Sequence, residues 1–356
     1  MRIFEIIALI LLTTTVFFSI RVKPSKAFLY ILFTSALSLI LQHWKEGIRW
    51  QLYPSVYLLL FMYCCYKFWS GRQNYASYKV IVLIWVMLCW LTPWSVPIFE
   101  MPEPGGRFLV GTQTFHLTDS SRVEWFTPES DDDFREIVLQ CWYPSGHSKS
   151  QLPEPYMDQM GIRAKPLSDA AGINSFLPSH LEYVKTNSYR NLRCSASNSP
   201  YPTLIFSHGI TGSRHLHQIL FEYLASRGFI VFAPNHSYDA SISIFPNGKI
   251  ADYRSEITGH PDSVAIRSMQ METRSKDIKY IQSIIVRMNS GDFPSKLKGK
   301  IDLNKLALGG HSFGGATAIC ASSDNKMIKA CIALDGWISP IPSTIINSGM
   351  DVPFLF

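Results

Sequence analysis

The stretch Lys305-Leu-Ala-Leu-Gly-Gly-His-Ser-Phe-Gly-Gly-Ala-Thr-Ala-Ile-Cys320 carries the most specific signal in this chain. Its apolar start, Leu306 to Leu308, predicts a buried strand, and its small residues after Gly314 predict a helix. The pentapeptide at their junction fits G-x-S-x-G, the pattern of a nucleophile elbow, in which a sharp strand-to-helix turn exposes a serine hydroxyl. We therefore predict an α/β-hydrolase fold with Ser312 as the nucleophile; the alternative is an incidental turn serine.

Composition excludes several function classes. The chain has 356 residues, 47% of them hydrophobic and only 17% charged, whereas about a quarter is usual for charged residues. The deficit lies in the first hundred residues. The net charge is +6, but no dense basic run with interleaved aromatics occurs, so we expect no nucleic-acid partner. The seven cysteines show no C-x-x-C spacing, so neither a zinc site nor a disulfide framework is indicated, and we expect no metal and no cofactor.

Residues 1–98 are predicted to form a membrane module. Each of the apolar stretches that stand out there has about 17 to 18 residues, the short end of what spans a bilayer. No small-residue cleavage site follows the first stretch, so it is not a signal peptide. We predict about four transmembrane helices. The stretches are approximately Ile3–Ile20, Ala27–Trp44, Leu52–Phe68 and Val80–Val96.

The loops of this module predict its orientation, because cytoplasmic loops are enriched in lysine and arginine. The first and third loops together hold six such residues and the opposite side holds four. We therefore expect an integral membrane protein, in the plasma membrane, with the hydrolase domain on the extracytoplasmic side and the lipid bilayer as a partner. Tryptophans near the segment ends fit the membrane interfaces. The six loop residues are Arg21, Lys23, Lys26, Lys67, Arg72 and Lys79; the opposite side has Arg2, Lys45, Arg49 and Arg107; the tryptophans are Trp44, Trp50, Trp69, Trp90 and Trp94.

Residues 99–109 are predicted to be a Pro/Gly-rich linker, and residues 110–356 the hydrolase domain. The domain opens with two strands, Val110–Thr118 and Arg135–Tyr143, that we expect to pair as an antiparallel hairpin. The alternation in the second of them predicts a half-buried strand. Residues 144–200 are long, polar and proline-containing, and we interpret them as an insertion or lid-like excursion.

Strands and helices alternate after residue 200. The apolar segments Tyr201–Phe206, Phe229–Ala233, Leu306–Gly310 and Ile328–Leu334 are predicted strands, and Pro353–Phe356 begins another. Helices are predicted between them, one with Leu216, Ile219, Leu220, Tyr223 and Leu224 on its apolar face and one over about Glu272–Met288. This order predicts a mostly parallel sheet with helices on both faces, whose site lies at the carboxyl ends of the strands.

The strand ends carry the chemistry that a serine nucleophile needs. A serine hydroxyl requires a base, a group that orients the base, and donors for the developing oxyanion. The N–H of Phe313 and the N–H of Ile210, in the loop after the first central strand, are the expected donors. Asp335 ends an apolar strand after Ser312 and is the expected triad acid; Asp351 is a weaker candidate.

The base cannot be assigned in the same way. In hydrolases of this order the histidine follows the acid, but the last of the ten histidines is His311, directly before the nucleophile. His208 and His236 are the histidines at strand ends near the site, and we expect both to be structural. The triad histidine is therefore absent from this chain.

Four motifs in order resemble the platelet-activating-factor acetylhydrolase family, type II or plasma type, of α/β-hydrolases. They are Phe206-Ser-His-Gly-Ile-Thr-Gly212, Gly228-Phe-Ile-Val-Phe-Ala-Pro-Asn-His236, the elbow Gly310-His-Ser-Phe-Gly-Gly-Ala-Thr317, and Ile332-Ala-Leu-Asp-Gly-Trp337. The helical module is similar to the N-terminus of bacterial, membrane-anchored relatives. The resemblance implies Ser312 as nucleophile, Asp335 as acid, and the N–H groups of Ile210 and Phe313 as oxyanion hole.

The resemblance also implies a calcium-independent serine esterase that acts on short or oxidised acyl esters of phospholipids, or on similar small esters. In the family, the triad histidine follows the strand after the acid, so we expect this hydrolase domain to be truncated at its C-terminus. Two alternatives stay open. One is a different α/β-hydrolase chemistry, such as that of a polyester hydrolase, dienelactone hydrolase or peptidase. The other is a catalytically dead hydrolase fold that serves as a binding module.

Overall fold

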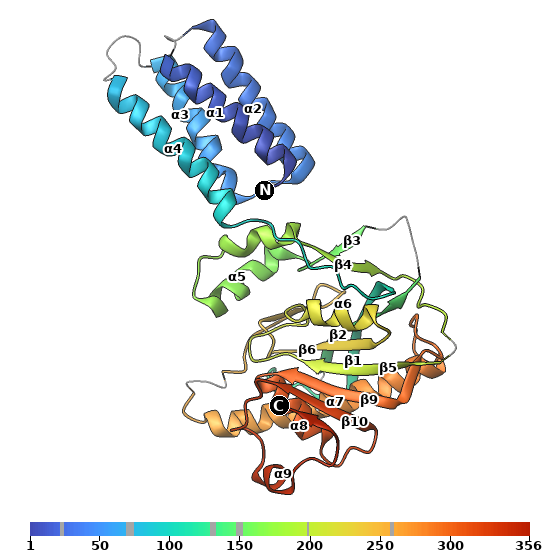
Figure 1. Cartoon of the computed structure of the whole chain (residues 1–356). Helices are drawn as coiled ribbons and strands as arrows, with labels where there is room; N and C mark the ends of the chain where they lie inside the picture. The colour runs from blue at the N-terminus through green and yellow to red at the C-terminus, as the bar shows by residue number, and fades with distance from the viewer. Residues whose placement is uncertain (22–24, 69–74, 129–132, 147–151, 198, 257–259) are drawn as a thin grey trace. The chain divides into compact units, whose positions relative to one another are not determined.

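The computed structural model describes residues 1–21, 25–68, 75–128, 133–146, 152–197, 199–256 and 260–356, drawn in Figure 1. Lys23, Trp69 and Arg72 lie outside the described residues. The chain divides into two compact units, Met1–Phe99 with Phe176–Val184, and Glu100–Ser175 with Lys185–Phe356. The first unit therefore includes a short segment from the region predicted to be a lid-like excursion.

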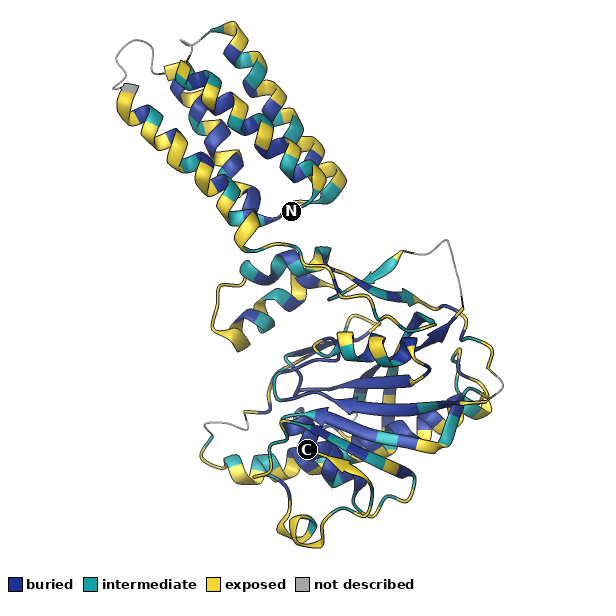
Figure 2. Cartoon of the chain, viewed as in Figure 1, coloured by how far each residue is buried: buried dark blue, intermediate teal, exposed yellow. Residues whose placement is uncertain are grey.

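The first unit is a bundle in which each predicted apolar stretch forms a helix. Three helices, α1 (Ile3–Arg21), α2 (Lys26–Glu46) and residues 76–95 of α4 (Tyr75–Ser95), are long and apolar enough to cross a membrane. The fourth, α3 (Tyr53–Phe68), follows the 3-10 turn η1 (Trp50–Leu52) and has 16 residues. Buried and exposed side chains alternate around each helix (Figure 2), and many of the exposed ones are apolar.

One end of the bundle is closed by a buried ion pair. Arg49 donates from Nη2 and Nε to Glu5, at 2.6 and 2.8 Å, and from Nη1 to the carbonyl of Val96 at 3.0 Å. Both side chains are fully buried, and a buried charge is tolerated only when it is paired in this way. The short helix η2 (Leu177–Tyr183) lies against the same end, where the Tyr183 hydroxyl donates to the carbonyl of Ile48 at 2.7 Å.

The second unit is built on a mixed sheet with the order β11-β10-β9-β5-β6-β2-β1-β4-β3. The strands from β11 to β6 are parallel. As predicted, the first two strands pair antiparallel. The strands are β1 (Leu109–Val123), β2 (Phe134–Ser145), β3 (Pro153–Pro155), β4 (Lys185–Arg190), β5 (Tyr201–Ser207), β6 (Ile230–His236), β9 (Ile301–His311), β10 (Ile328–Leu334) and β11 (Phe354–Leu355); β7 (Ile242–Ile244) and β8 (Ile250–Asp252) pair separately.

Helices cover both faces of the sheet, as expected for an α/β fold. Helices α7 (Ser263–Ser290) and α8 (Phe313–Ser322) share one core with Ile137 and Leu139 of β2. Helix α6 (Gln218–Ser226) packs on the opposite face, where Phe221 meets Trp142. The prediction of a half-buried β2 is therefore wrong, because this central strand is covered on both faces. Shorter helices are α5 (Met160–Ala171) and α9 (Ser343–Ser348).

The structure differs from two further expectations, one about α6 and one about residues 144–200. The predicted apolar face of α6 is buried only in part. Leu220 and Leu224 pack against the core. Ile219 and Tyr223 are exposed, whereas Phe221 and Ala225 are buried. In residues 144–200, β4 pairs in parallel with β1 and extends the sheet. Part of the region predicted to be a lid-like excursion is therefore a strand of the main sheet.

Candidate active site

Ser312 occupies a sharp turn between β9 and α8. Its backbone has φ 54° and ψ −121°, a conformation that costs a non-glycine residue free energy and is found mainly at functional sites. The turn needs small neighbours. A Cβ atom at Gly310 would lie 2.1 Å from the carbonyl oxygen of Gly314, and a Cβ atom at Gly314 would lie 2.1 Å from that of Ser207. Only glycine fits at either position, so the sequence pattern and the strained serine have the same steric cause.

The loop after β5 lies directly beside this turn. A Cβ atom at Gly209 would be 3.4 Å from the Cβ of Ser312. Among the turn, loop and cap hydrogen bonds of the described residues, neither the Ile210 amide nor the Phe313 amide donates to a carbonyl. The Phe313 amide also begins α8, where the helix dipole favours negative charge. The segments that carry the two predicted oxyanion donors thus lie beside Ser312, and neither amide has a carbonyl partner among these hydrogen bonds.

Asp335 follows β10 at the same edge of the sheet. Its backbone has φ 48°, and its side chain is exposed. The backbone on both sides of it bonds to the elbow: Ser312 N–H donates to Leu334 at 3.0 Å, and Trp337 N–H donates to Ser312 at 3.1 Å. Asp351 is also exposed, in the segment before β11. The structure therefore places Asp335, rather than Asp351, in the segment whose backbone bonds to the turn of Ser312.

Neither strand-end histidine presents a free ring nitrogen. His208 is buried; its Nδ1 donates to the carbonyl of Gly209 at 2.6 Å and its Nε2 accepts from the His236 N–H at 3.1 Å. Burial, and then the charge of Arg274, hold the pKa of His208 well below its usual value. This imidazole is neutral and fully engaged, so it cannot take a proton from Ser312 in this arrangement.

His236 forms hydrogen bonds with a buried serine and a buried aspartate, which are the residue types of a catalytic triad. Its Nε2 meets Ser207 Oγ at 3.1 Å and its Nδ1 meets Asp277 Oδ2 at 2.8 Å. All three side chains are buried, and Arg135 also donates two hydrogen bonds to Asp277, at 2.7 and 3.1 Å. Burial alone would raise the pKa of Asp277, but Arg135 and His236 hold it well below its usual range. No substrate can reach Ser207 here, so we interpret these three hydrogen-bonded side chains as structural.

This buried histidine predicts a pH dependence of stability. Burial, and then the charge of Arg274, lower the pKa of His236 to about 4, against about 6.5 in an unfolded chain. The unfolded state therefore binds the proton first, and the free energy of unfolding should fall as the pH drops from about 6.5 towards 4, by up to about 3 kcal/mol from this group. Urea unfolding at a series of pH values measures it. The slope should flatten in His236→Gln and persist in His260→Gln; equal slopes would contradict the assignment.

Two partly exposed histidines, His217 and His311, lie beside the elbow. The position of His311 follows from the sequence, but that of His217 was not predicted. The rings of His217 and His311 are 5.1 Å apart, and His311 Nδ1 would be 3.3 Å from a Cβ atom at Gly209. Burial, and then the neighbouring His311, lower the pKa of His217 to about 4. His217 precedes α6, and nothing in its sequence context indicated that the loop after β5 folds back to the nucleophile.

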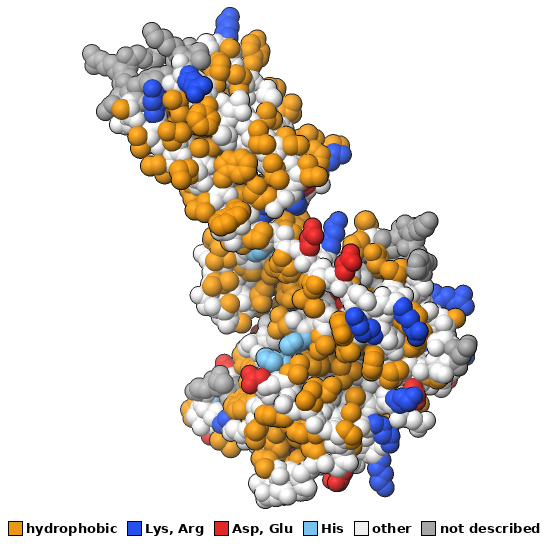
Figure 3. Space-filling view, viewed as in Figure 1, with side chains coloured by type: hydrophobic (Ala, Val, Ile, Leu, Met, Phe, Trp, Pro, Cys, Tyr) orange, Lys and Arg blue, Asp and Glu red, His pale blue; other side chains and the backbone are white. Residues whose placement is uncertain are grey.

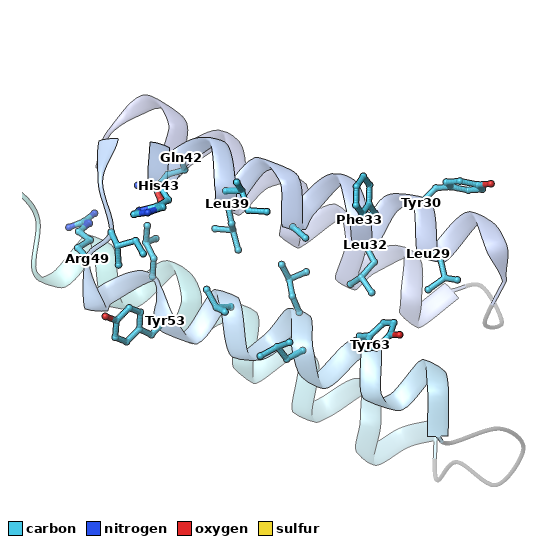
Figure 4. A pocket seen from close by; sticks show the side chains of 17 residues that line it. Leu29, Tyr30, Leu32, Phe33, Leu39, Gln42, His43, Arg49, Tyr53 and Tyr63 are labelled. Atoms are coloured by element: carbon cyan, nitrogen blue, oxygen red, sulfur yellow. The ribbon is translucent and has the colours of Figure 1, made fainter. Parts of the chain in front are cut away.

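A large groove lies elsewhere in the described residues. The groove lies in the first unit between α2 and α3, has a volume of about 730 Å³, and is apolar along its length, with Gln42, His43 and Arg49 at one end (Figure 4). Ser312 belongs to the second unit. The described residues contain no group of three or more His, Cys, Asp and Glu side chains that could hold a metal ion.

Comparison with known proteins identifies the family. The model of the family "Platelet-activating factor acetylhydrolase, isoform II" matches residues 99–356. The chain belongs to this family. The match covers the whole second unit and, from the first unit, Phe99 and residues 176–184. Helices α1 to α4 lie outside the match, so they are not part of what defines the family.

Curated relatives and solved structures agree with this membership. The chain is 32% identical over 276 residues to platelet-activating factor acetylhydrolase of Canis lupus familiaris and 28% identical over 284 residues to that of Cavia porcellus, which covers 71% and 72% of this chain. The chain spans 59% of the length of each of these relatives. A ferulic acid esterase from Streptomyces cinnamoneus superposes with a TM-score of 0.55 at 28% identity, over 72% of this chain and 67% of that one.

Proposed function

We propose that this chain is a membrane-anchored serine ester hydrolase that acts on short or oxidised acyl esters of phospholipids, or on similar small carboxylic esters. The observation that carries the proposal is the elbow: Ser312 at φ 54°, between glycines that no other residue can replace, with two available amides beside it. The esterases and acetylhydrolases among its relatives support the reaction class.

The proposed mechanism proceeds through an acyl-enzyme. Ser312 Oγ attacks the ester carbonyl carbon as a base removes its proton, and the oxygen that becomes negative accepts hydrogen bonds from the amides of Ile210 and Phe313. The tetrahedral intermediate expels the alcohol, which takes up the proton from the base. Water then attacks the acyl-serine by the same route and releases the carboxylic acid.

Asp335 is proposed to orient the base. Strand β11 pairs in parallel with β10, with Ile332 opposite Leu355, so the carboxyl end of β11 lies at the same edge as Asp335. A base that Asp335 orients would therefore lie at this edge of the sheet. Of the strand-end alternatives, His208 and His236 have both ring nitrogens engaged inside the core.

Asp335→Asn is expected to lower kcat of the full-length protein on p-nitrophenyl acetate by about 10⁴-fold, because the amide favours the wrong tautomer of the base. The steady-state rate of nitrophenol release measures the loss. Asp351→Asn is the matched control, since it changes an exposed aspartate of the weaker candidate position, and it should retain activity. Full activity in Asp335→Asn would reject Asp335 as the acid.

A non-catalytic role is the second candidate function, favoured by the engagement of both strand-end imidazoles. A fluorophosphonate probe separates the two. Covalent labelling of Ser312 supports the hydrolase, while an unlabelled but folded protein supports a binding module.

We further propose that the helices of the first unit span the bilayer and hold the hydrolase unit on the extracytoplasmic side. Three helices of sufficient length and hydropathy support the anchoring, as do the hydrophobic side chains that make up much of the visible surface of the described part of the bundle (Figure 3). The lysine and arginine bias of the loops supports the orientation. Alkaline phosphatase fused after Phe356 should be active, and the same enzyme fused after Phe68 should be inactive. The reverse pattern would refute the orientation.

A further inference from the structure

The loop that carries the Ile210 amide is held from inside the core by a buried arginine of α7. The side chain of Arg274 is fully buried and pairs with Asp239. Its Nη1 donates to the carbonyl of His208 at 2.6 Å and its Nη2 to the carbonyl of Gly209 at 3.5 Å. Its guanidinium carbon also lies 4.8 Å from the centre of the Phe313 ring. One side chain thus contacts both segments that carry the proposed oxyanion donors.

These contacts determine the direction of the Ile210 amide. The carbonyl of Gly209 and the N–H of Ile210 belong to one planar trans peptide unit, so they point in opposite directions. The Gly209 oxygen accepts from His208 Nδ1 at 2.6 Å, from the Gly212 N–H at 3.2 Å, and from Arg274. With the carbonyl turned towards Arg274, the Ile210 N–H must point away from it.

Asp239 contacts both Arg274 and the loop that carries Ile210. Its carboxylate accepts from Arg274 Nε, and its backbone carbonyl accepts from the Thr211 N–H at 3.2 Å. Ile210 therefore lies between two residues, Gly209 and Thr211, that are each tied to the Arg274–Asp239 pair. A lysine could keep the charge of Arg274 but not its planar set of donors.

We propose that Arg274, oriented by Asp239, is a positioning residue that directs the Ile210 amide towards the oxyanion formed at Ser312. This inference rests on the proposed function. It assigns to α7 a role in transition-state stabilisation through the loop, without contact to the substrate.

The test compares Arg274→Lys, Arg274→Met and Asp239→Asn with Glu272→Gln in the full-length protein. Glu272 is on the same helix, 67% exposed, and pairs only with Lys276 among the described ion pairs. With p-nitrophenyl acetate, the Arg274 and Asp239 variants should lose about 10²- to 10³-fold in kcat with KM within about twofold, because an oxyanion donor acts in the transition state. Glu272→Gln should match the parent. A change in KM alone, or unchanged kcat in folded Arg274→Met, would overturn the proposal.

Crystal structures of the parent protein and of Arg274→Lys provide a readout that needs no turnover. The conservative variant Arg274→Lys also replaces Arg274→Met in the test if Arg274→Met does not fold. The Gly209–Ile210 peptide should rotate in the variant, so that the Ile210 N–H no longer faces Ser312. An unrotated peptide would overturn the positioning role. If the parent protein hydrolyses no ester, the proposed function fails, whereas the peptide direction still decides this inference.

Discussion

Ser312→Ala is expected to reduce ester hydrolysis by at least about 10⁴-fold, because removal of the nucleophile leaves only the residual contribution of the oxyanion donors and substrate binding. Covalent labelling by a fluorophosphonate should disappear at the same time. Both are measured on the full-length protein, the rate with p-nitrophenyl acetate and the adduct by mass spectrometry of the peptide that contains the elbow.

Ser343→Ala is the matched control, because Ser343 is an exposed serine at the start of α9, away from the elbow. It should keep both rate and label. A label that persists in Ser312→Ala would show that another serine is the nucleophile and that the elbow has been misinterpreted. Ser207 is the nearest serine paired with a histidine, but its hydroxyl is buried, so we do not expect it to take over.

Gly314→Ala is expected to lower the free energy of unfolding by about 3 kcal/mol or more and to abolish activity. Its Cβ would lie 2.1 Å from the carbonyl oxygen of Ser207 and 2.6 Å from that of His208. These are backbone atoms, so α8 would have to move away from β5, and overpacking of this kind is among the more costly substitutions. Urea unfolding of the parent and variant measures the loss.

Gly161→Ala is the control for the same chemical change. Gly161 lies in α5, and no atom lies within 4 Å of where its Cβ would be. Because alanine has the higher helix propensity, by about 1 kcal/mol at most, this variant should be as stable as the parent or slightly more stable. Equal stability of Gly314→Ala and the parent would mean that the elbow is not as closely packed against β5 as the structure has it.

The local patterns of the sequence were sufficient for much of the fold. The alternation of apolar runs with helical periodicity predicted the parallel strands, the opening hairpin and the last strand, and each is present. The elbow was predictable because part of its steric exclusion acts within five consecutive residues: a Cβ atom at Gly310 would meet Gly314, whereas the exclusion at Gly314 comes from Ser207 of β5. Such short-range requirements leave a mark in consecutive residues.

Contacts between segments that are far apart in the chain could not be predicted from such local patterns. The buried face of α6 was predicted only in part, because its apolar residues occur around much of the helix and Phe221 is buried by Trp142 and Phe206, which belong to other elements. The hydrogen bonds that link Ser207 to His236 and His236 to Asp277 join residues from β5, β6 and α7. These three residues were visible as residue types, but their burial, which makes them structural, was not.

By itself the sequence determined the nucleophile's turn, the order of strands and helices, and the apolar character of the first hundred residues, since these depend on residues that are neighbours in the chain. The tertiary structure alone decided which histidines are buried in the core, that His217 lies beside His311, and that Arg274 of α7 bonds to the loop that carries Ile210. The physical reason is that hydrogen-bond direction and burial are set by the packing of segments far apart in the chain, and no single segment contains that information.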